Sequence, residues 1–464
     1  MPEFPGNQIV ILGAGITGLT AGYELSRMPG SRVVVVEKEH YLGGLAATLR
    51  IDRLSVDIGS HRIQSTVSRS IRSYLTDTLG IELLKQPRRG LLYMQGLRFK
   101  YPPSLFNMLR VLPLKKSFSY SLSLLERFRY PKDASNYRTA MLSNVGKRVY
   151  ESFYRDFVYK LWGITAENIA IEGMKRRKTI LDANAFFKSI TGRHDYFYYP
   201  RDGMGSIAAR FAECIRKNGG ILHTGSRLAS IVVDDSGRIS SISFTDRAGE
   251  HFSLHNPLVI STIPIDELHE RVHRNRKTPV LQWREIRIVY LHISENLPLR
   301  NETFYFPHRE IPCGRISFIQ KYSPHLNTQA SGTIITFEFP ASAGDTIWEM
   351  EEEALCRICI DGLKTAGIIT SLPTVRHMHS IGIKKAYPIY STDWKTNYHT
   401  CFNRLAQISN LFVMGRRGLF LHCNVDHAIR QGIEAAKIIH GGSNQANTEW
   451  NRKIPSFSSF CARD

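Results

Sequence analysis

The run Gln8-Ile-Val-Ile-Leu12, followed directly by Gly13-Ala-Gly15-Ile-Thr-Gly18, decides the fold of this chain. A short apolar run with β-branched side chains is typical of a buried parallel strand. Helical periodicity continues from Leu19 to Arg27, and a second apolar run, Val33 to Val36, ends at Glu37. A strand, a glycine turn, a helix, a second strand and an acidic residue within ~30 residues form the arrangement that binds a dinucleotide.

Each glycine of this turn has its own role. Gly13 makes the tight turn, Gly15 lets the backbone approach a pyrophosphate, and Gly18 lets helix and strand pack closely. The helix N-terminus offers N–H groups to the phosphates, and Glu37 lies where a carboxylate accepts hydrogen bonds from a ribose. In this context we favour a dinucleotide-binding α/β unit of Rossmann type over a glycine turn used only for packing.

A second group of glycines narrows the dinucleotide. The segments Tyr41-Leu-Gly43-Gly44 and Val56-Asp57-Ile58-Gly59-Ser60-His61 lie just beyond the acidic residue. A domain for NAD does not need this second turn, whereas one that buries extended FAD does, because loop backbone must pass close to the flavin. With GAGITGL, VVVEKEHYLGG and DIGSHRI, the chain resembles the superfamily of FAD-dependent amine oxidases, protoporphyrinogen oxidases and UDP-galactopyranose mutases.

The resemblance extends to two later segments. Tyr199-Pro-Arg-Asp-Gly-Met-Gly205 resembles the turn and helix that precede the adenine-binding strands of the superfamily. Gly415-Arg416 follows an apolar run, and the helix that opens at Asn424 resembles the last flavin contact. The resemblance implies FAD contacts at Gly13, Gly15, Gly18, Glu37, Gly43, Gly44, Gly59, Ser60, His61, Val232, Gly415, Arg416 and Asp426.

We expect two interleaved domains. A discontinuous, glutathione-reductase-like FAD-binding domain is predicted from residues 1–85, 196–264 and 405–440, and an α+β substrate domain from residues 86–195 and 265–404. Residues 441–464 are polar and lack a pattern, and we expect them to be a loose tail.

The substrate segments resemble UDP-galactopyranose mutases. Tyr159-Lys160-Leu-Trp162 precedes Arg176 and Arg177, as in the mutases' first diphosphate-binding element. Arg315 matches their second arginine, and planar guanidinium groups can grip a diphosphate from both sides. The resemblance implies catalytic roles for His61, Arg315, Arg176, Arg177 and Tyr387.

Two positions depart from the mutase pattern. Phe318 replaces the glutamate expected after Arg315. The segment Phe420–Asp426 differs from the Tyr-rich mutase segment and looks closer to a protoporphyrinogen-oxidase-like branch. The nearest resemblance is therefore to a mutase-like branch of the superfamily rather than to a standard mutase.

Two activities follow from the resemblance, and both stay open at this point. The first is flavin N5 chemistry on a nucleotide-activated sugar, by ring rearrangement or a related modification. The second is a redox enzyme of the protoporphyrinogen or amine oxidase type, in which the flavin takes a hydride. Amine oxidases surround the amine with paired aromatics, and Phe420 stands alone before Asp426, which lowers the amine option.

Composition and charge set wider limits. The chain has 464 residues, of which 42% are hydrophobic, so a disordered, collagenous or coiled-coil protein is excluded. A formal charge of +20 implies an acidic partner. Seven scattered cysteines and the absence of a signal-peptide pattern predict free thiols and a cytoplasmic enzyme. Cys356 and Cys359 form a CxxC on the apolar side of a predicted helix, and we expect core packing rather than a metal.

Basic and aromatic residues alternate between Lys115 and Tyr130. Such a cluster superficially fits stacking on single-stranded nucleic acid. The same spacing fits an amphipathic helix that covers the flavin or touches a membrane. We expect a small-molecule substrate, a nucleotide diphosphate sugar, and no nucleic-acid partner, while peripheral membrane contact and the oligomeric state stay open.

Overall fold

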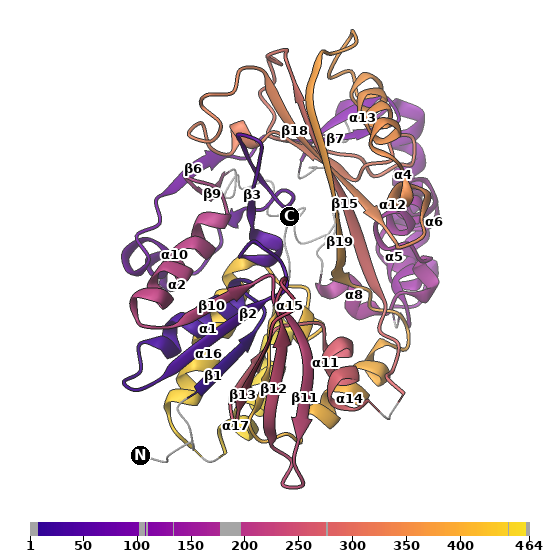
Figure 1. Ribbon diagram of the computed structural model, residues 1–464. Helices are drawn as coiled ribbons and strands as arrows, with labels where there is room; N and C mark the ends of the chain where they lie inside the picture. Colours follow the sequence, from indigo (N-terminus) through magenta and orange to yellow (C-terminus); the bar gives the residue numbers. More distant parts are fainter. Residues whose placement is uncertain are drawn as a thin grey trace.

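A parallel sheet and a larger, mostly antiparallel sheet form the frame of the molecule (Figure 1). The computed structural model describes residues 8–101, 107, 110–132, 134–176, 196–274, 277–443 and 445–460. Within these residues, no helix is both long and apolar enough to cross a membrane.

The parallel sheet has five strands in the order β10-β2-β1-β14-β20. Each strand is short, all but the edge strand β10 are mostly buried, and β1 pairs in parallel with both β2 and β14. Helices α1 and α16 pack closely at Gly432 of α16, where a Cβ would lie only 2.6 Å from the Thr20 side chain of α1. The predicted Rossmann-type α/β fold is confirmed. Its elements are β1 (Gln8–Leu12), α1 (Ile16–Ser26), β2 (Arg32–Glu37), α10 (Gly205–Lys217), β10 (Ile221–Thr224), β14 (Leu258–Ser261), β20 (Leu411–Val413), α15 (Gly415–Gly418) and α16 (Val425–His440).

Three smaller sheets attach to this core. An antiparallel sheet of β11, β12 and β13 follows β10, and two others build the loops beside the glycine turns. Asp57 at the end of β4 is buried and accepts hydrogen bonds from Thr48 and Tyr199, and burial raises its pKa to about 6. The strands are β3 (Thr48–Ile51), β4 (Leu54–Asp57), β5 (Ile63–Gln64), β6 (Leu83–Pro87), β9 (Tyr196–Pro200), β11 (Arg227–Val233), β12 (Ile239–Thr245) and β13 (His251–His255).

The larger sheet has seven strands in the order β19-β15-β18-β17-β16-β7-β8. All of its neighbouring strands are antiparallel except β16 and β7. Its strands come from the two segments that we assign to a substrate domain. They are β7 (Gly90–Met94), β8 (Leu97–Tyr101), β15 (Trp283–Ile293), β16 (Thr303–Tyr305), β17 (Arg315–Ser317), β18 (Thr333–Ala341) and β19 (Val375–Pro388).

Helices cover one side of the larger sheet, and a second group lies near its lower end (Figure 1). Cys359 is buried on α13 and Cys356 is partly buried, as expected for core packing, and no group of metal-ligating residues occurs within the described ranges. The helices of these two groups are α4 (Leu114–Glu126), α5 (Tyr137–Val145), α6 (Lys147–Val149), α7 (Arg155–Trp162), α8 (Ile171–Arg176), α11 (Ile265–Val272), α12 (Thr346–Glu349), α13 (Glu352–Thr365) and α14 (Trp394–Leu405). A further helix, α2 (Arg69–Ser73), belongs to the other part of the molecule, where it contacts α16.

Lys160 of α7 holds a loop rather than a ligand. Its ammonium nitrogen lies 2.6–2.8 Å from four backbone carbonyl oxygens, those of Phe306, His308, Ile311 and Cys313, which share its three N–H donors. Burial lowers the pKa of Lys160 to about 8. The segment that resembles the mutase element is therefore used here, at Lys160, to shape the loop between β16 and β17.

The expectation of a loose tail is wrong for residues 445–460. Residues 446–453 form α17 (Ala446–Lys453), and a 3-10 turn follows it. Trp450 is fully buried, and its indole N–H donates to the carbonyl of Val413 at 3.0 Å. The polar sequence did not indicate this docking, because a few separated apolar side chains, mainly Trp450, Phe457 and Phe460, supply the contact with the core.

Candidate active site

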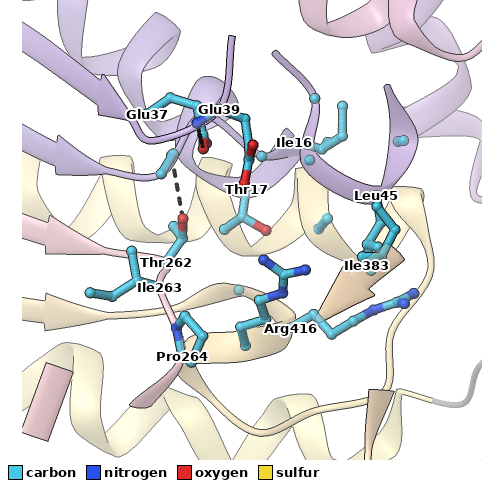
Figure 2. A pocket seen from close by; sticks show the side chains of 18 of the residues that line it. Ile16, Thr17, Glu37, Glu39, Leu45, Thr262, Ile263, Pro264, Ile383 and Arg416 are labelled. Carbon is cyan, nitrogen blue, oxygen red and sulfur yellow. Dashed lines mark hydrogen bonds between the residues drawn. The ribbon is translucent and has the colours of Figure 1, made fainter. Parts of the chain in front are cut away.

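A cavity of about 910 Å³ extends from the glycine turn after β1 to the end of β19. Its wall includes the ends of β1 and β2, the loops after them, and the start of α16. Figure 2 shows side chains from these separate segments around the same space. The volume is large enough for a dinucleotide cofactor with room for a substrate.

The three glycines of the first turn differ in what surrounds them. Gly13 has a φ of +98°, and a Cβ there would lie 2.4 Å from Thr262 Oγ1. A Cβ on Gly15 would meet no atom within 4 Å, and Gly13 and Gly15 both line the cavity. A Cβ on Gly18 would lie 2.2 Å from the carbonyl oxygen of Gly13, and Gly18 is not part of the wall. Gly18 therefore packs the helix against the turn, while Gly15 leaves backbone open to the cavity.

Glu37 is fixed at the end of β2. One carboxylate oxygen accepts the Ala14 N–H at 2.8 Å and the other accepts the Glu39 N–H at 3.0 Å. The side chain lines the cavity, as Figure 2 shows. Each oxygen has a further lone pair, so the carboxylate can accept a ribose hydroxyl.

The second glycine turn lies against the first. The Gly43 N–H donates to the Ala14 carbonyl at 2.8 Å, and Gly43 has a φ of +100°. Gly43 and Gly44 line the cavity. Gly59 does not line the cavity. It lies against Glu338 instead, since a Cβ on Gly59 would be 3.2 Å from the carboxyl carbon of Glu338. Close approach of Glu338 therefore explains Gly59.

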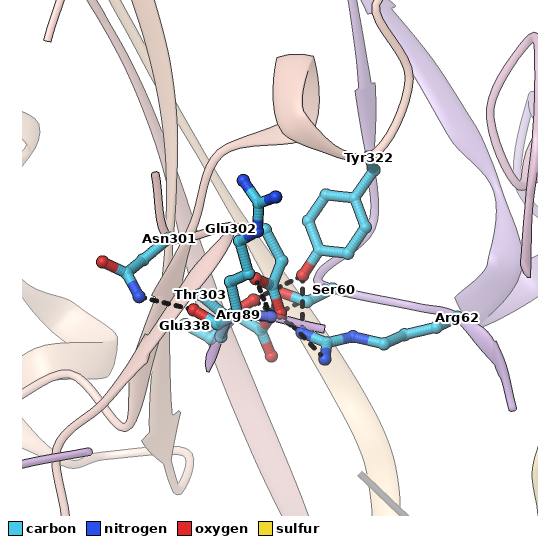
Figure 3. Close-up of polar contacts among 8 residues, drawn as sticks. All are labelled: Ser60, Arg62, Arg89, Asn301, Glu302, Thr303, Tyr322 and Glu338. Atoms are coloured by element: carbon cyan, nitrogen blue, oxygen red, sulfur yellow. Dashed lines mark hydrogen bonds and ion pairs between the residues drawn. The ribbon is translucent and has the colours of Figure 1, made fainter. Parts of the chain in front are cut away.

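Glu338 on β18 joins two wall residues, Ser60 and Arg315 (Figure 3 shows its contact with Ser60). Both the N–H and the O–H of Ser60 donate to Glu338 Oε1 at 2.7 Å, and Arg315 Nε donates to the same oxygen at 2.7 Å. Burial opposes ionisation of Glu338, but the Arg315 guanidinium and the Ser60 hydrogen bonds outweigh it and lower the pKa of this carboxyl. Glu338 was not expected from the sequence, although it lies directly opposite Arg315 across two strands.

His61 lies on the cavity wall. Burial and the nearby guanidinium groups of Arg416 and Arg315 lower the pKa of His61 to about 4. The imidazole is therefore neutral near pH 7, with one nitrogen as a donor and the other as an acceptor.

Arg62 anchors the same loop from the other side (Figure 3). Its guanidinium group pairs with Glu302 at 3.4 Å and donates to Thr303 Oγ1 at 2.6 Å and to Tyr322 OH at 2.8 Å. Both charged side chains are 3% exposed. The loop that carries Ser60 and His61 is thus fastened to the larger sheet at two points.

Another part of the cavity wall is formed by Arg416, Tyr387 and His422. Arg416 Nη2 donates to the carbonyl of Cys423, and its guanidinium carbon lies 5.5 Å from the centroid of the Tyr387 ring. The rings of Tyr387 and His422 are 5.3 Å apart. Arg416 Nη1 is buried and finds no hydrogen-bond partner among the described residues. A buried, unpartnered N–H group of an arginine in a cavity wall fits a phosphate or another anionic group.

Besides Gly18 and Gly59, four predicted site residues are not found on this wall. Val232 is 50% exposed; Ser226, Arg227 and Leu228, at the start of β11, line the cavity instead. The Ser226 N–H donates to the Glu37 carbonyl at 2.9 Å, so the chain meets the cavity before it reaches Val232. Asp426 is also absent from the wall, which Asn424, Val425 and Ala428 form around it. The other two are Arg176, which ends α8 and whose side chain lies outside the described residues, and Arg177, which lies wholly outside them.

The two phenylalanines at departing positions belong to the core. Phe420 is fully buried, and its ring centroid lies 4.8 Å from that of Trp283 and 5.7 Å from that of Tyr390. Phe318 is 2% exposed. Neither lines the cavity.

Fold and site together define an FAD-dependent enzyme: a Rossmann-type sheet, two glycine turns, a fixed acidic residue and an arginine whose Nη1 has no partner among the described residues surround one cavity. The sequence profile of the family described as flavin containing amine oxidoreductase matches residues 16–440. The chain therefore belongs to this family.

Curated relatives match over parts of the chain. Human all-trans-retinol 13,14-reductase is 22% identical over 308 residues, which cover 57% of this chain and 48% of the relative. Human protoporphyrinogen oxidase is 33% identical over 119 residues, which cover 23% of this chain and 25% of the relative. The chain thus spans about half the length of the retinol reductase.

Solved structures match over nearly the whole chain. Reduced UDP-galactopyranose mutase superposes with a TM-score of 0.78 at 19% identity, covering 98% of this chain and 99% of the mutase. An oxidoreductase from Methanosarcina mazei superposes with a TM-score of 0.63 at 15% identity, covering 93% of this chain and 100% of that protein. At such identities the likeness shows the fold.

Proposed function

We propose that the enzyme acts on a nucleotide diphosphate sugar held beside the flavin of its FAD. The observation that carries this proposal is that Arg315 and Tyr387 share one cavity wall with the neutral His61. A fixed guanidinium group beside an uncharged donor and acceptor suits a ligand that joins an anionic diphosphate to a neutral sugar.

The cofactor would be held by the two glycine turns, by Glu37 at the ribose, and by Arg416 and the first turn of α16 at the other end. When bound, FAD supplies its N5 atom, which acts as a nucleophile in the reduced state and as a hydride acceptor in the oxidised state. A sugar rearrangement requires the reduced state, whereas hydride removal from a substrate requires the oxidised state.

The chain's own residues orient the substrate and stabilise charge. Arg315, fixed by its ion pair with Glu338, would hold the diphosphate as negative charge develops on it. Tyr387 would donate its hydroxyl to the same group, and His61 would contact the sugar. The resemblance to the mutases also assigns Arg176 and Arg177 to this clamp, and their side chains lie outside the described residues. The proposal includes a cytosolic location, which the free thiols of the described cysteines support.

The test is to incubate the purified, FAD-loaded enzyme with a panel of UDP-sugars, with and without dithionite. Conversion to an isomeric sugar only in the presence of dithionite, with no net oxidation, is the expected result. Formation of peroxide or reduction of a quinone, with no isomer, would overturn the sugar proposal.

A binding experiment tests the clamp directly. Arg315→Ala should weaken UDP binding by ~1.5–3 kcal/mol, because a charged hydrogen bond is lost. Glu338→Gln separates the loss of the ion pair from the loss of the arginine, and Arg376→Ala on the exposed face of β19 is the matched control. Unchanged UDP affinity in Arg315→Ala would exclude Arg315 from the diphosphate site.

A second candidate, hydride transfer with an apolar substrate, rests on another part of the wall. Leu45, Leu49, Ile381 and Ile383 line the cavity, and the retinol reductase is a redox enzyme by name. In the same incubations, oxidation or reduction of an apolar alkene or alcohol without turnover of UDP-sugars would favour this candidate.

A further inference from the structure

Helix α4 turns large apolar side chains toward solvent. Leu114, Phe118 and Leu125 are 89%, 68% and 67% exposed, and Phe128 in the following turn is 70% exposed. Their spacing of four, seven and three residues places them on one side of a continuing helix. We call these four residues the α4 patch.

The opposite side of α4 packs through small polar groups. Ser123 is fully buried, its hydroxyl donates to the Val145 carbonyl at 2.9 Å, and the Val149 N–H donates to it at 3.2 Å. A Cβ on Gly146 would lie 1.8 Å from the Ser123 carbonyl oxygen, so the backbones are in close contact. This packing fixes the rotation of α4. Leucine and phenylalanine therefore face outward where a globular helix normally turns them to the core.

Basic residues flank the α4 patch. The segment from Leu114 to Tyr130 contains four basic residues and one acidic residue. The acidic residue, Glu126, pairs with Arg148 at 3.0 Å. Arg127 extends over the ring of Phe128 at 4.8 Å. The patch thus combines an apolar surface with a positive rim.

Neither α4 nor the turn after it lines the cavity, so this segment does not cover the flavin. Figure 1 shows α4 at the outer edge of the molecule, where it contacts α5 and α6. The face that carries the patch is free of other described elements, because its side chains are largely exposed.

We propose that the α4 patch docks on an anionic lipid bilayer. Apolar side chains of an interfacial helix enter the boundary between headgroups and acyl chains, and flanking lysines and arginines contact anionic headgroups. A second copy of this strongly basic chain would bring like charges together at the patch, whereas an anionic bilayer neutralises them.

The experiment measures flotation of the FAD-loaded enzyme with two vesicle types. One contains phosphatidylcholine alone, and the other contains phosphatidylcholine with phosphatidylserine. The test variant is Phe118→Glu/Leu125→Glu. The matched control is Val280→Glu/Leu372→Glu, at two positions that are 72% and 71% exposed elsewhere on the surface. FAD content and thermal unfolding verify that each variant folds.

The wild-type enzyme should float with the phosphatidylserine vesicles, and added salt should weaken this binding. The affinity of the patch variant for these vesicles should fall by ~10-fold or more, because two charges would enter the apolar boundary. The control variant should bind as the wild type does. Failure of the wild type to bind, or equal loss in both variants, would overturn the proposal. A third result would also overturn the proposal: the wild type sediments as a dimer, the patch variant sediments as a monomer, and both bind vesicles equally. A second copy of the chain would then cover the patch.

Discussion

Gly15 and Gly18 have different surroundings, so an alanine methyl group would have a different effect at each position. Gly15→Ala should leave the thermal stability of the cofactor-free protein nearly unchanged, because its φ of −70° suits alanine and a Cβ meets no atom within 4 Å. The methyl group would instead enter the cavity beside the phosphates, so FAD affinity should fall by ~10-fold or more. Titration of the cofactor-free variant with FAD, followed by flavin fluorescence, measures this loss.

Gly18→Ala is the contrasting variant. Its Cβ would lie 2.2 Å from a backbone oxygen, so the helix must shift, at a cost of ~1–3 kcal/mol in the free energy of unfolding. Urea denaturation of the cofactor-free protein checks this value. Equal stability of the two variants would contradict the division of roles between these glycines.

His61 makes the stability depend on pH. Its pKa is lowered from 6.5 to about 4 in the folded protein, so between these values the unfolded chain binds a proton that the folded chain excludes. The free energy of unfolding should therefore fall as the pH falls through this window. His61→Asn should reduce this slope, as measured by urea denaturation from pH 7 down to pH 4. The exposed His255→Asn is the control, and a slope unchanged in His61→Asn would argue against an imidazole that stays neutral in the folded protein.

Sequence alone could locate the backbone of the site better than its polar network. The glycine turns and Glu37 are local patterns, because strand, turn and helix follow one another along the chain. Glu338 contacts Ser60, which is far away in the sequence, and Arg315, which lies on the neighbouring strand. These three residues come together only through the folded arrangement of the strands. No local pattern marks such a residue.

At the scale of elements, strands were easier to anticipate than the points where they meet the cavity. The strands after α10 were expected, yet the wall uses Leu228 rather than Val232. Both residues lie on β11, and at ~3.3 Å per residue they are separated by ~13 Å. Which end of a strand meets a cavity depends on its neighbours in the sheet, which the sequence does not display.

Helix α17 tests the role of the C-terminal segment. Trp450→Ala should lower the free energy of unfolding by ~3–5 kcal/mol, because a fully buried ring and its hydrogen bond to β20 are both lost. Since β20 leads directly to Gly415 and Arg416, FAD affinity should fall as well. Urea denaturation and FAD titration measure the two effects. The exposed Leu372→Ala should change neither, and a Trp450 variant as stable as the wild type would mean that this segment does not dock.

At the scale of the whole molecule, the cavity wall combines the parallel sheet with the larger sheet. A ligand in this cavity contacts only the folded chain, so excess FAD should raise the melting temperature of the cofactor-free protein. The gain approaches ~4 kcal/mol at a thousandfold excess over the dissociation constant. Differential scanning calorimetry with increasing FAD measures it. Gly15→Ala should need more FAD for the same rise, and a melting temperature independent of FAD would mean that the folded chain does not bind this cofactor.

The wall also has a consequence for biosynthesis. It joins residues near Gly13 to residues as late as Ala428, more than four hundred positions further along the chain. A ribosome releases these segments in order, so a nascent polypeptide that ends before Ala428 cannot enclose the dinucleotide. FAD must therefore bind late in translation or after release, when the segment near Ala428 has joined the strands that were synthesised first.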